Sequence, residues 1–280
     1  MNARRSLAGL RRDWTRLGQA DPLWAVCVDR LKQGGRWDIE EFLARGRAEI
    51  ADAMADLDRL GMCARRDDAL DFGCGVGRLT AALAVHFGSV TGVDISPSML
   101  GHARKLHADN PRCRFVQNDS LDLQAFASGC FDLVYSGLVL QHMPAALAGG
   151  YLAEFVRVVR PGGAIVILVP EAHLRTPRGI VYAYAPRHLI GLIQRRVYGY
   201  PAPMRMYTLP ASRVRRLVEP LGARVVASIP KEAYGGHWRM TEHFIVSGHA
   251  QGNRPDATAQ RPALQAARPG PLLPMVESGI

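Results

Sequence analysis

The chain has 280 residues, of which 48% are hydrophobic, so it holds enough apolar material for one sizeable core. Its formal net charge of +10 fits an acidic partner, such as nucleic acid, a membrane surface or an anionic metabolite, and it equally fits a generally basic, solvated surface, which we favour. No apolar run reaches the roughly 18 residues that span a bilayer, which argues against a membrane-spanning protein. No apolar segment follows the N-terminal arginines, which argues against a secreted protein. Both observations predict a cytoplasmic protein.

The first 51 residues are predicted to form an N-terminal helical extension. Three segments carry helical patterns, Asp13–Leu17, Pro22–Leu31 and Ile39–Ala51. Residues 33–35, with two glycines, break the pattern between the second and the third segment.

From Ala69 on, short apolar runs alternate with helical periods. This alternation is typical of βαβ units, and it predicts an α/β fold with a doubly wound, mostly parallel sheet. The predicted strands are Ala69–Phe72, Ser89–Val93, Arg114–Gln117, Phe131–Ser136 and Ala164–Val169. The helices expected between them are Arg78–Phe87, one that begins at Ser96-Pro97, and Ala145–Val159.

The region after Pro170 is less regular. Prolines interrupt the apolar and basic stretch 174–207, which we interpret as a lid-like insertion over the edge of the sheet. The predicted elements that follow are a helix and two strands, Ser212–Glu219, Arg224–Ser228 and Glu242–Ser247. They complete a Rossmann-like, seven-stranded sheet within a domain of residues 52–250. Residues 251–280 are rich in Pro, Ala, Gly and Arg and predict a disordered tail.

The cysteines are scattered along the chain without a C-x-x-C pair. They are Cys27, Cys63, Cys74, Cys113 and Cys130. This spacing indicates neither a disulfide framework nor a zinc site, and it predicts buried free thiols.

A glycine-rich loop follows the first predicted strand. Gly73, Gly75 and Gly77 occupy alternate positions, which lets the backbone pass tightly under a bulky ligand with its amides facing it. Asp71 precedes these glycines. Asp94 ends the second strand about twenty residues later, where an acid can accept both hydroxyls of a ribose.

A third acid, Asp119, ends the third strand, where it can bind an exocyclic amine of a purine. The three strand-end acids and the glycine loop resemble the class I methyltransferase family, and the match extends over about 69–170 in order and spacing. The resemblance implies that Asp71 and the loop glycines hold the methionine and ribose portions of S-adenosylmethionine. It also implies that Asp94 binds the ribose hydroxyls and that Asp119 binds the adenine amine.

A nicotinamide oxidoreductase is the main alternative. Its fingerprint needs a glycine or alanine where this chain has Arg78. An acid ahead of the glycines also suits a sulfonium cation and opposes a pyrophosphate, so we predict a methyltransferase. Two further alternatives are an RNA methyltransferase, suggested by the net charge alone, and a non-catalytic scaffold that binds the cofactor.

The residues after the fourth strand reduce the number of chemical classes to which the methyl acceptor can belong. Residues 136–144 lack the Asn/Asp-Pro-Pro-Tyr/Phe signature shared by enzymes that methylate amines of bases. The chain has no Pro-Cys pair for C5-pyrimidine chemistry, and no acid beside Ser136 for the metal-dependent catechol type. We therefore predict metal-independent transfer, chiefly to oxygen, on a small-molecule acceptor such as a sugar, a lipid-linked compound or a natural product, with no DNA partner.

Two side chains are candidates for the chemistry around the cofactor. His142 lies just after the fourth strand, where open α/β sheets bind ligands, and is the predicted general base, with Gln141 as a positioning neighbour. Its alternative role is to cap the next helix or only to line the pocket. Arg47, on the helix before the sheet, is the predicted bidentate partner of the cofactor carboxylate, and its alternative is a solvated surface arginine.

The insertion 174–207 combines apolar, aromatic and basic residues and is expected to lie over the pocket. We favour a lid helix that packs its apolar face on the core. The alternative is a surface that selects an apolar or lipid-linked acceptor, or that makes a peripheral contact with a membrane.

Overall fold

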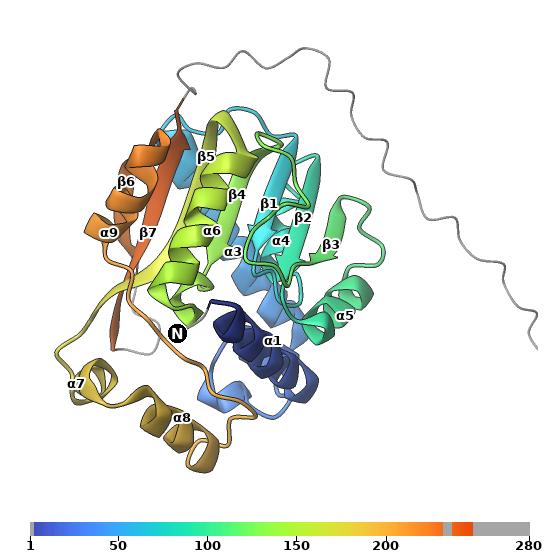
Figure 1. Ribbon diagram of the computed structural model, residues 1–280. Coiled ribbons are helices and arrows are strands. Elements are labelled where there is room, and N and C mark those ends of the chain that lie inside the picture. The colour runs from blue at the N-terminus through green and yellow to red at the C-terminus, as the bar shows by residue number, and fades with distance from the viewer. Residues whose placement is uncertain (1–2, 232–236, 249–280) are drawn as a thin grey trace, which may run out of the picture. The chain divides into compact units, whose positions relative to one another are not determined.

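The computed structural model of the chain describes residues 3–231 and 237–248. Its centre is a seven-stranded sheet in the order β3-β2-β1-β4-β5-β7-β6, in which β7 runs antiparallel to both of its neighbours and the pairs from β3 to β5 are parallel (Figure 1). The strands are β1 (Asp68–Phe72), β2 (Ser89–Asp94), β3 (Cys113–Gln117), β4 (Phe131–Gly137), β5 (Val159–His173), β6 (Ala223–Lys231) and β7 (Trp238–Ser247). This order confirms the predicted doubly wound, mostly parallel, seven-stranded fold.

Alternate residues of the central strands face opposite sides of the sheet. Leu70 and Phe72 of β1 pack with Val134 of β4 in one buried cluster. Ala69 and Leu133, their neighbours along the same strands, belong to a second cluster on the other side. Both faces of the sheet are therefore covered, which explains why these strands are nearly continuous apolar runs in the sequence.

Helices supply the cover on each face (Figure 1). α3 (Ile39–Arg59) and α4 (Arg78–Leu83) contribute to one cluster, while α6 (Ala145–Val158) and α9 (Ala211–Val218) contribute to the other. α5 (Pro97–Leu106) begins as predicted, because the Ser96 side chain accepts the backbone N–H of Met99 and proline occupies the first turn.

The N-terminal helices differ in extent from the prediction. α1 (Ala3–Ala20) begins well before Asp13, because its leucines pack into the core cluster beneath α6. α3 continues to Arg59 because its second half buries an apolar face against α4. The predicted helix Pro22–Leu31 is wrong, since the structure has α2 (Pro22–Val26) and a separate 3-10 turn that begins after the capping residue Asp29.

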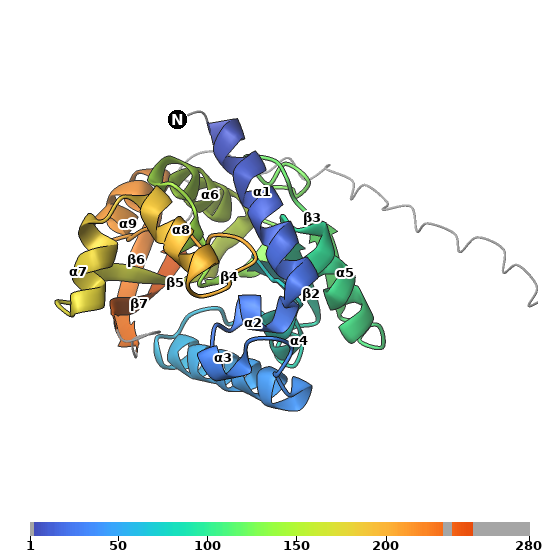
Figure 2. The same ribbon diagram turned by 90° about the horizontal axis from the view of Figure 1, so that it is seen from below.

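The insertion at 174–207 contains α7 (Pro177–Tyr184) and α8 (Arg187–Arg196). Both helices lie at the carboxyl ends of the strands, the side of the molecule that also carries α1 and α2 (Figure 2). None of the described helices is both long and apolar enough to cross a membrane. The predicted tail, 251–280, lies outside the described residues.

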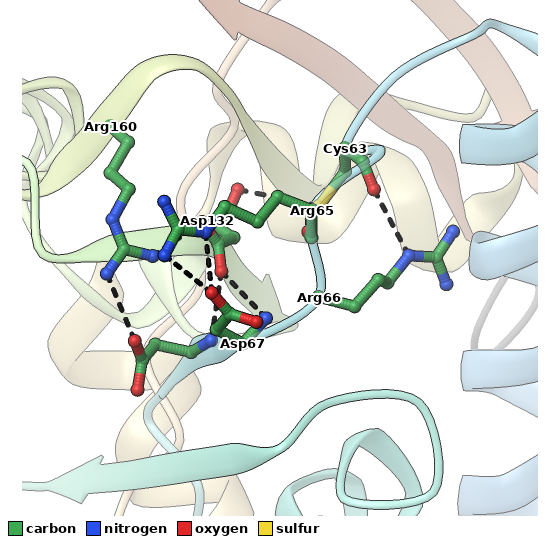
Figure 3. Close-up of polar contacts among 7 residues, drawn as sticks. Cys63, Arg65, Arg66, Asp67, Asp132 and Arg160 are labelled. Atoms are coloured by element: carbon green, nitrogen blue, oxygen red, sulfur yellow. Dashed lines mark hydrogen bonds and ion pairs between the residues drawn. The ribbon is translucent and has the colours of Figure 1, made fainter.

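At the amino ends of the strands, opposite the candidate site, Asp132 joins β4 to the segment that leads into β1 (Figure 3). Its carboxylate accepts the backbone N–H groups of Asp67 and Asp68 at 2.8 and 2.9 Å and forms an ion pair with Arg160 of β5. Burial raises the pKa of Asp132, but these donors outweigh burial and hold it below the ordinary value of 3.8. The cluster ties three strands together away from the candidate site.

Candidate active site

A cavity of about 280 Å³ lies at the carboxyl ends of β1, β2 and β4. The glycine loop and Asp94 form part of its lining, together with residues of α1, α2 and the segment after β4. α7 and α8 contribute Tyr182 and Gln194. The chain builds the sheet from β1 to β3 in one direction and from β4 onward in the other, so the cavity lies at the switch point where such sheets bind ligands.

The glycine loop passes tightly between neighbouring elements. Gly73, Gly75 and Gly77 have φ angles of 79°, 55° and 83°, a region that favours glycine. A Cβ atom on Gly75 would lie 2.7 Å from the Val26 side chain, and one on Gly77 would lie 2.7 Å from His107. Gly73 and Gly75 line the cavity, whereas Gly77 starts α4 and packs away from it.

Asp94, at the end of β2, lines the cavity as the sequence predicted. One carboxylate oxygen accepts the N–H of Gly75 at 2.9 Å, and the other accepts the N–H of Ser96 at 2.8 Å. Burial raises the pKa of Asp94, against the backbone N–H groups, which lower it. A carboxylate has about four acceptor positions, so Asp94 keeps acceptor capacity for a ligand hydroxyl beyond its backbone donors.

Asp71 lies behind the loop rather than in the cavity lining. Its carboxylate is buried and accepts the Thr80 hydroxyl at 2.6 Å, which ties β1 to α4. Burial raises the pKa of Asp71 to about 7, because the hydroxyl and the nearby Arg78 only partly offset the loss of water. The structure therefore places Asp71 as a support of the loop.

Asp119 lies beside α1, in a second hollow. Its half-exposed side chain forms a 2.8 Å salt bridge with Arg11. The neighbouring residue Asn118 lines the main cavity, and the two hollows share Leu7 and Ile95 in their linings. The predicted purine contact thus falls at the border between the two hollows.

His142 lines the cavity in the 3-10 turn after β4. Its Nδ1 lies 2.7 Å from the carbonyl oxygen of Arg205. Because a carbonyl only accepts, Nδ1 carries the proton of the neutral ring and Nε2 keeps a lone pair. Burial lowers the pKa of His142 to about 4, although the carbonyls of Arg205 and Leu138 favour the protonated ring. The imidazole is therefore neutral at physiological pH and can accept a proton at Nε2.

The arginine at the cavity is Arg78 rather than the predicted Arg47. Arg47 is half exposed on α3 and forms an ion pair with Glu40, outside the described lining. Arg78, directly after the third glycine, lines the cavity with a side chain only 4% exposed. It forms a 2.8 Å salt bridge with Glu49 of α3. The correction arises because Arg47 lies on the solvent face of α3, while Glu49 faces the sheet.

A network of buried polar side chains continues from Glu49, the partner in this salt bridge. The Tyr135 hydroxyl lies 3.3 Å from a carboxylate oxygen of Glu49 and 3.3 Å from one of Glu242. Lys231 pairs with Glu242 at 2.9 Å. Burial raises the pKa of Glu242, and Lys231 opposes that shift. This network links α3, β4, β6 and β7 to Arg78 at the cavity.

The cavity walls come from parts of the chain that are far apart in sequence. Their aromatic residues are Trp14, Phe72, Tyr151, Tyr182, Tyr200 and Trp238. Their methionines are Met99, Met143, Met204, Met206 and Met240. The buried Gln141 side chain also lines the cavity, and its Oε1 has no hydrogen-bond partner among the described residues. Sequence reasoning named Gln141 but missed the walls, because no local pattern marks residues that only folding brings together.

The loop and the strand-end acids lie in the part of the chain that is similar to known methyltransferases. Residues 69–163 match the family described as a methyltransferase domain. The chain is 30% identical over 163 residues to the 2-methyl-6-phytyl-1,4-hydroquinone methyltransferase of Synechocystis sp., which covers 58% of this chain and 50% of that protein. It is 40% identical over 106 residues to the trans-aconitate 2-methyltransferase of Deinococcus radiodurans, 37% of this chain and 38% of that one. The chain thus spans half or less of these relatives.

A solved structure supports the same fold. The magnesium protoporphyrin IX methyltransferase of Synechocystis, with bound S-adenosylhomocysteine, superposes with a TM-score of 0.55 over 84% of this chain and 97% of that one, at 20% identity. At that identity the likeness concerns the fold alone. Residues 69–163, which carry the glycine loop and Asp94 of the cavity lining, therefore form a methyltransferase domain of the class I S-adenosylmethionine-dependent kind.

Proposed function

We propose that this chain transfers the methyl group of S-adenosylmethionine to an oxygen atom of a small, largely apolar acceptor. The observation that carries the proposal is that one cavity brings together the glycine loop, Asp94 and His142. The cofactor, when bound, supplies an electrophilic methyl group on a sulfonium centre. The chain's own residues then need to hold the two reactants in line and to take up a proton.

The lining fits the cofactor. The Asp94 carboxylate keeps acceptor capacity for a ribose hydroxyl beyond its backbone donors. Gly73 and Gly75 bring the backbone of the loop into the same lining, where Val139 and Val26 pack against the glycines and leave no room for a side chain. Arg78 lines the same cavity and can bind a carboxylate, and the adjoining hollow beside Asp119 offers space for an adenine.

His142 is the proposed base. Its Nε2 accepts the proton of the acceptor hydroxyl, while the carbonyl of Arg205 holds the ring in the required tautomer. The unpartnered Oε1 of Gln141 can accept a second hydrogen bond from the acceptor and orient it. Aromatic rings exclude water around the reacting atoms. Among them is Trp14, whose ring centre lies 4.9 Å from that of His142 in an edge-on arrangement.

The walls support an aromatic or otherwise apolar acceptor. Aromatic, methionine and aliphatic side chains together make up most of the lining, and the aromatic and methionine side chains favour planar, apolar ligands. One relative is named for a phytylated hydroquinone, which carries both a ring and hydroxyl groups. Another is named for trans-aconitate, an anionic acid, so an anionic acceptor is the alternative that the experiment includes.

The proposal is tested by turnover with methyl-labelled S-adenosylmethionine and a panel of alkylated hydroquinones, phenols, short polycarboxylates and total RNA. We expect label on a hydroxyl of an apolar ring compound. Asp94→Ala should reduce cofactor affinity by on the order of a hundredfold, because a charged acceptor of two ribose hydroxyls is lost. Label confined to RNA or to a carboxylate would contradict the acceptor class. Binding without turnover on any compound would favour a scaffold.

A further inference from the structure

The segment between β5 and β6 has an unusual charge. Residues 172–218 contain nine arginines and neither aspartate nor glutamate. Among the described residues, the salt bridges of this segment involve Arg205 and Arg215. The three arginines of α8 lie outside these pairs and are exposed. The segment therefore presents excess positive charge to the solvent.

Exposed apolar side chains lie on the same two helices. Ile180, Val181 and Tyr184 share one face of α7 and are 52%, 50% and 85% exposed. α8 adds two exposed leucines, Leu189 and Leu192, on the face that carries Arg195 and Arg196. Six of the eleven large apolar side chains exposed in the described part of the chain fall within residues 180–197. This concentration marks a surface that is suited to a partner.

The inner sides of these helices meet the cavity. Tyr182 of α7 and Gln194 of α8 line it. The Gln194 amide bonds the backbone N–H and carbonyl of Met204, each at 3.0 Å, which holds the following segment against α8. Each helix thus has an inner side chain in the cavity lining and exposed side chains on its outer face, and both lie at the carboxyl ends of the strands (Figures 1 and 2).

We propose that the outer face of α7 and α8 binds the surface of an anionic lipid bilayer and so brings the cavity to the membrane. The arginines complement anionic head groups, and the apolar stripe of α7 can insert to the level of the acyl boundary. This combination of exposed apolar residues with arginines and no acid favours a lipid surface over an ordinary protein partner, whose polar rim carries both signs of charge. The inference rests on this surface alone and does not depend on the proposed acceptor.

Vesicle co-sedimentation of the full chain tests the proposal without any turnover. Vesicles with equal parts of phosphatidylglycerol and phosphatidylcholine should sediment the protein, and vesicles of phosphatidylcholine alone should leave it in solution. Binding should weaken as salt is raised, because the head-group attraction is screened. The result is independent of cofactor, so a failure here is distinguishable from a failure of the proposed activity.

Paired variants separate this surface from general charge and hydrophobicity. Ile180→Ser with Tyr184→Ser should weaken partitioning by on the order of tenfold, while Val85→Ser, 70% exposed elsewhere, should not. Arg195→Glu with Arg196→Glu should abolish binding. Arg104→Glu with Lys105→Glu on α5 makes the same change in net charge, and this variant should keep most of its vesicle binding. Far-ultraviolet circular dichroism and thermal unfolding check that each variant folds.

Three outcomes would overturn the proposal. The first is no sedimentation with anionic vesicles. The second is equal loss of binding in the α8 and α5 charge variants, which would assign binding to net charge. The third is a dimer in sedimentation velocity that the α7 double variant converts to a monomer, which would assign the face to a second copy of the chain.

Discussion

Arg78 is the arginine that the fold brings to the cavity. Its side chain is buried, lines the cavity and is paired with Glu49 of α3. A planar guanidinium can bind a second carboxylate in a bidentate manner. We therefore expect Arg78 to hold the carboxylate of the cofactor's methionine portion.

Arg78→Gln should lower cofactor affinity by about tenfold to a hundredfold, because a charge-assisted hydrogen bond contributes about 1.5–3 kcal/mol. Arg47→Gln is the matched control, since that side chain is exposed and pairs with Glu40 outside the cavity. Isothermal titration calorimetry measures both variants, and thermal unfolding without ligand reports any cost of leaving Glu49 without its partner. An equal loss in the two variants would contradict the assignment.

His142 should set the acidic limb of the pH profile of turnover. Its pKa is lowered by burial to about 4, so the ring becomes protonated, and inactive as a base, only as the pH falls through about 4. We expect a flat profile from about pH 5 to neutrality, in place of the decline near pH 6 to 7 that an exposed imidazole would produce.

Substitution separates the base from a positioning role. His142→Ala should lower kcat by on the order of a hundredfold or more with cofactor affinity nearly unchanged. His102→Ala, exposed on α5, should behave as the original chain. A small loss in His142→Ala that leaves the acidic limb in place would refute general-base catalysis.

At the scale of secondary-structure elements, Asp132 connects β4, β5 and the approach to β1 (Figure 3). Asp132→Asn should destabilise the fold by about 2 kcal/mol. The neutral amide loses the ion pair with Arg160 and accepts the two backbone N–H groups less strongly than the carboxylate does. Urea unfolding at neutral pH measures the change. Asp67→Asn, whose side chain is 57% exposed, is the control and should change the free energy of unfolding by about 0.5 kcal/mol or less.

The sign of the pH effect follows from the lowered pKa of Asp132. Its folded-state pKa lies below the unfolded value, so its contribution is complete above the ordinary value of 3.8 and is lost as the pH falls through the folded value. The difference between the original chain and Asp132→Asn should therefore shrink in acid. A difference that stays constant down to pH 2 would show that the ion pair is not its cause.

For the whole molecule, cofactor binding should raise thermal stability, because the loop, Asp94 and α1 form the lining only in the folded chain. A ligand at a hundred times its Kd stabilises by about 2.7 kcal/mol, which corresponds to a rise in Tm of roughly 5 to 10 °C at this size. Differential scanning fluorimetry with S-adenosylhomocysteine should show that rise, and NAD at the same concentration should not. A shift with NAD alone would reverse the assignment.

The sheet, the glycine loop and the position of Asp94 at the end of a strand could be predicted from local sequence patterns. Apolar runs, helix caps such as Ser96 and glycines in a turn are local signals, and each depends on residues only a few positions away. The family resemblance rested on the same local features, which explains why it extended no further than about 69–170.

Tertiary packing sets which side chains share the cavity. It turned Arg47 to the solvent and brought Arg78 inward, and it placed Asp71 beneath the loop instead of in the lining. It also set the low pKa of His142, which burial lowers although the carbonyl of Arg205, more than sixty residues away, opposes that shift. Burial and long-range contacts arise from packing between distant segments, and no pattern within a short window of sequence encodes which segments meet.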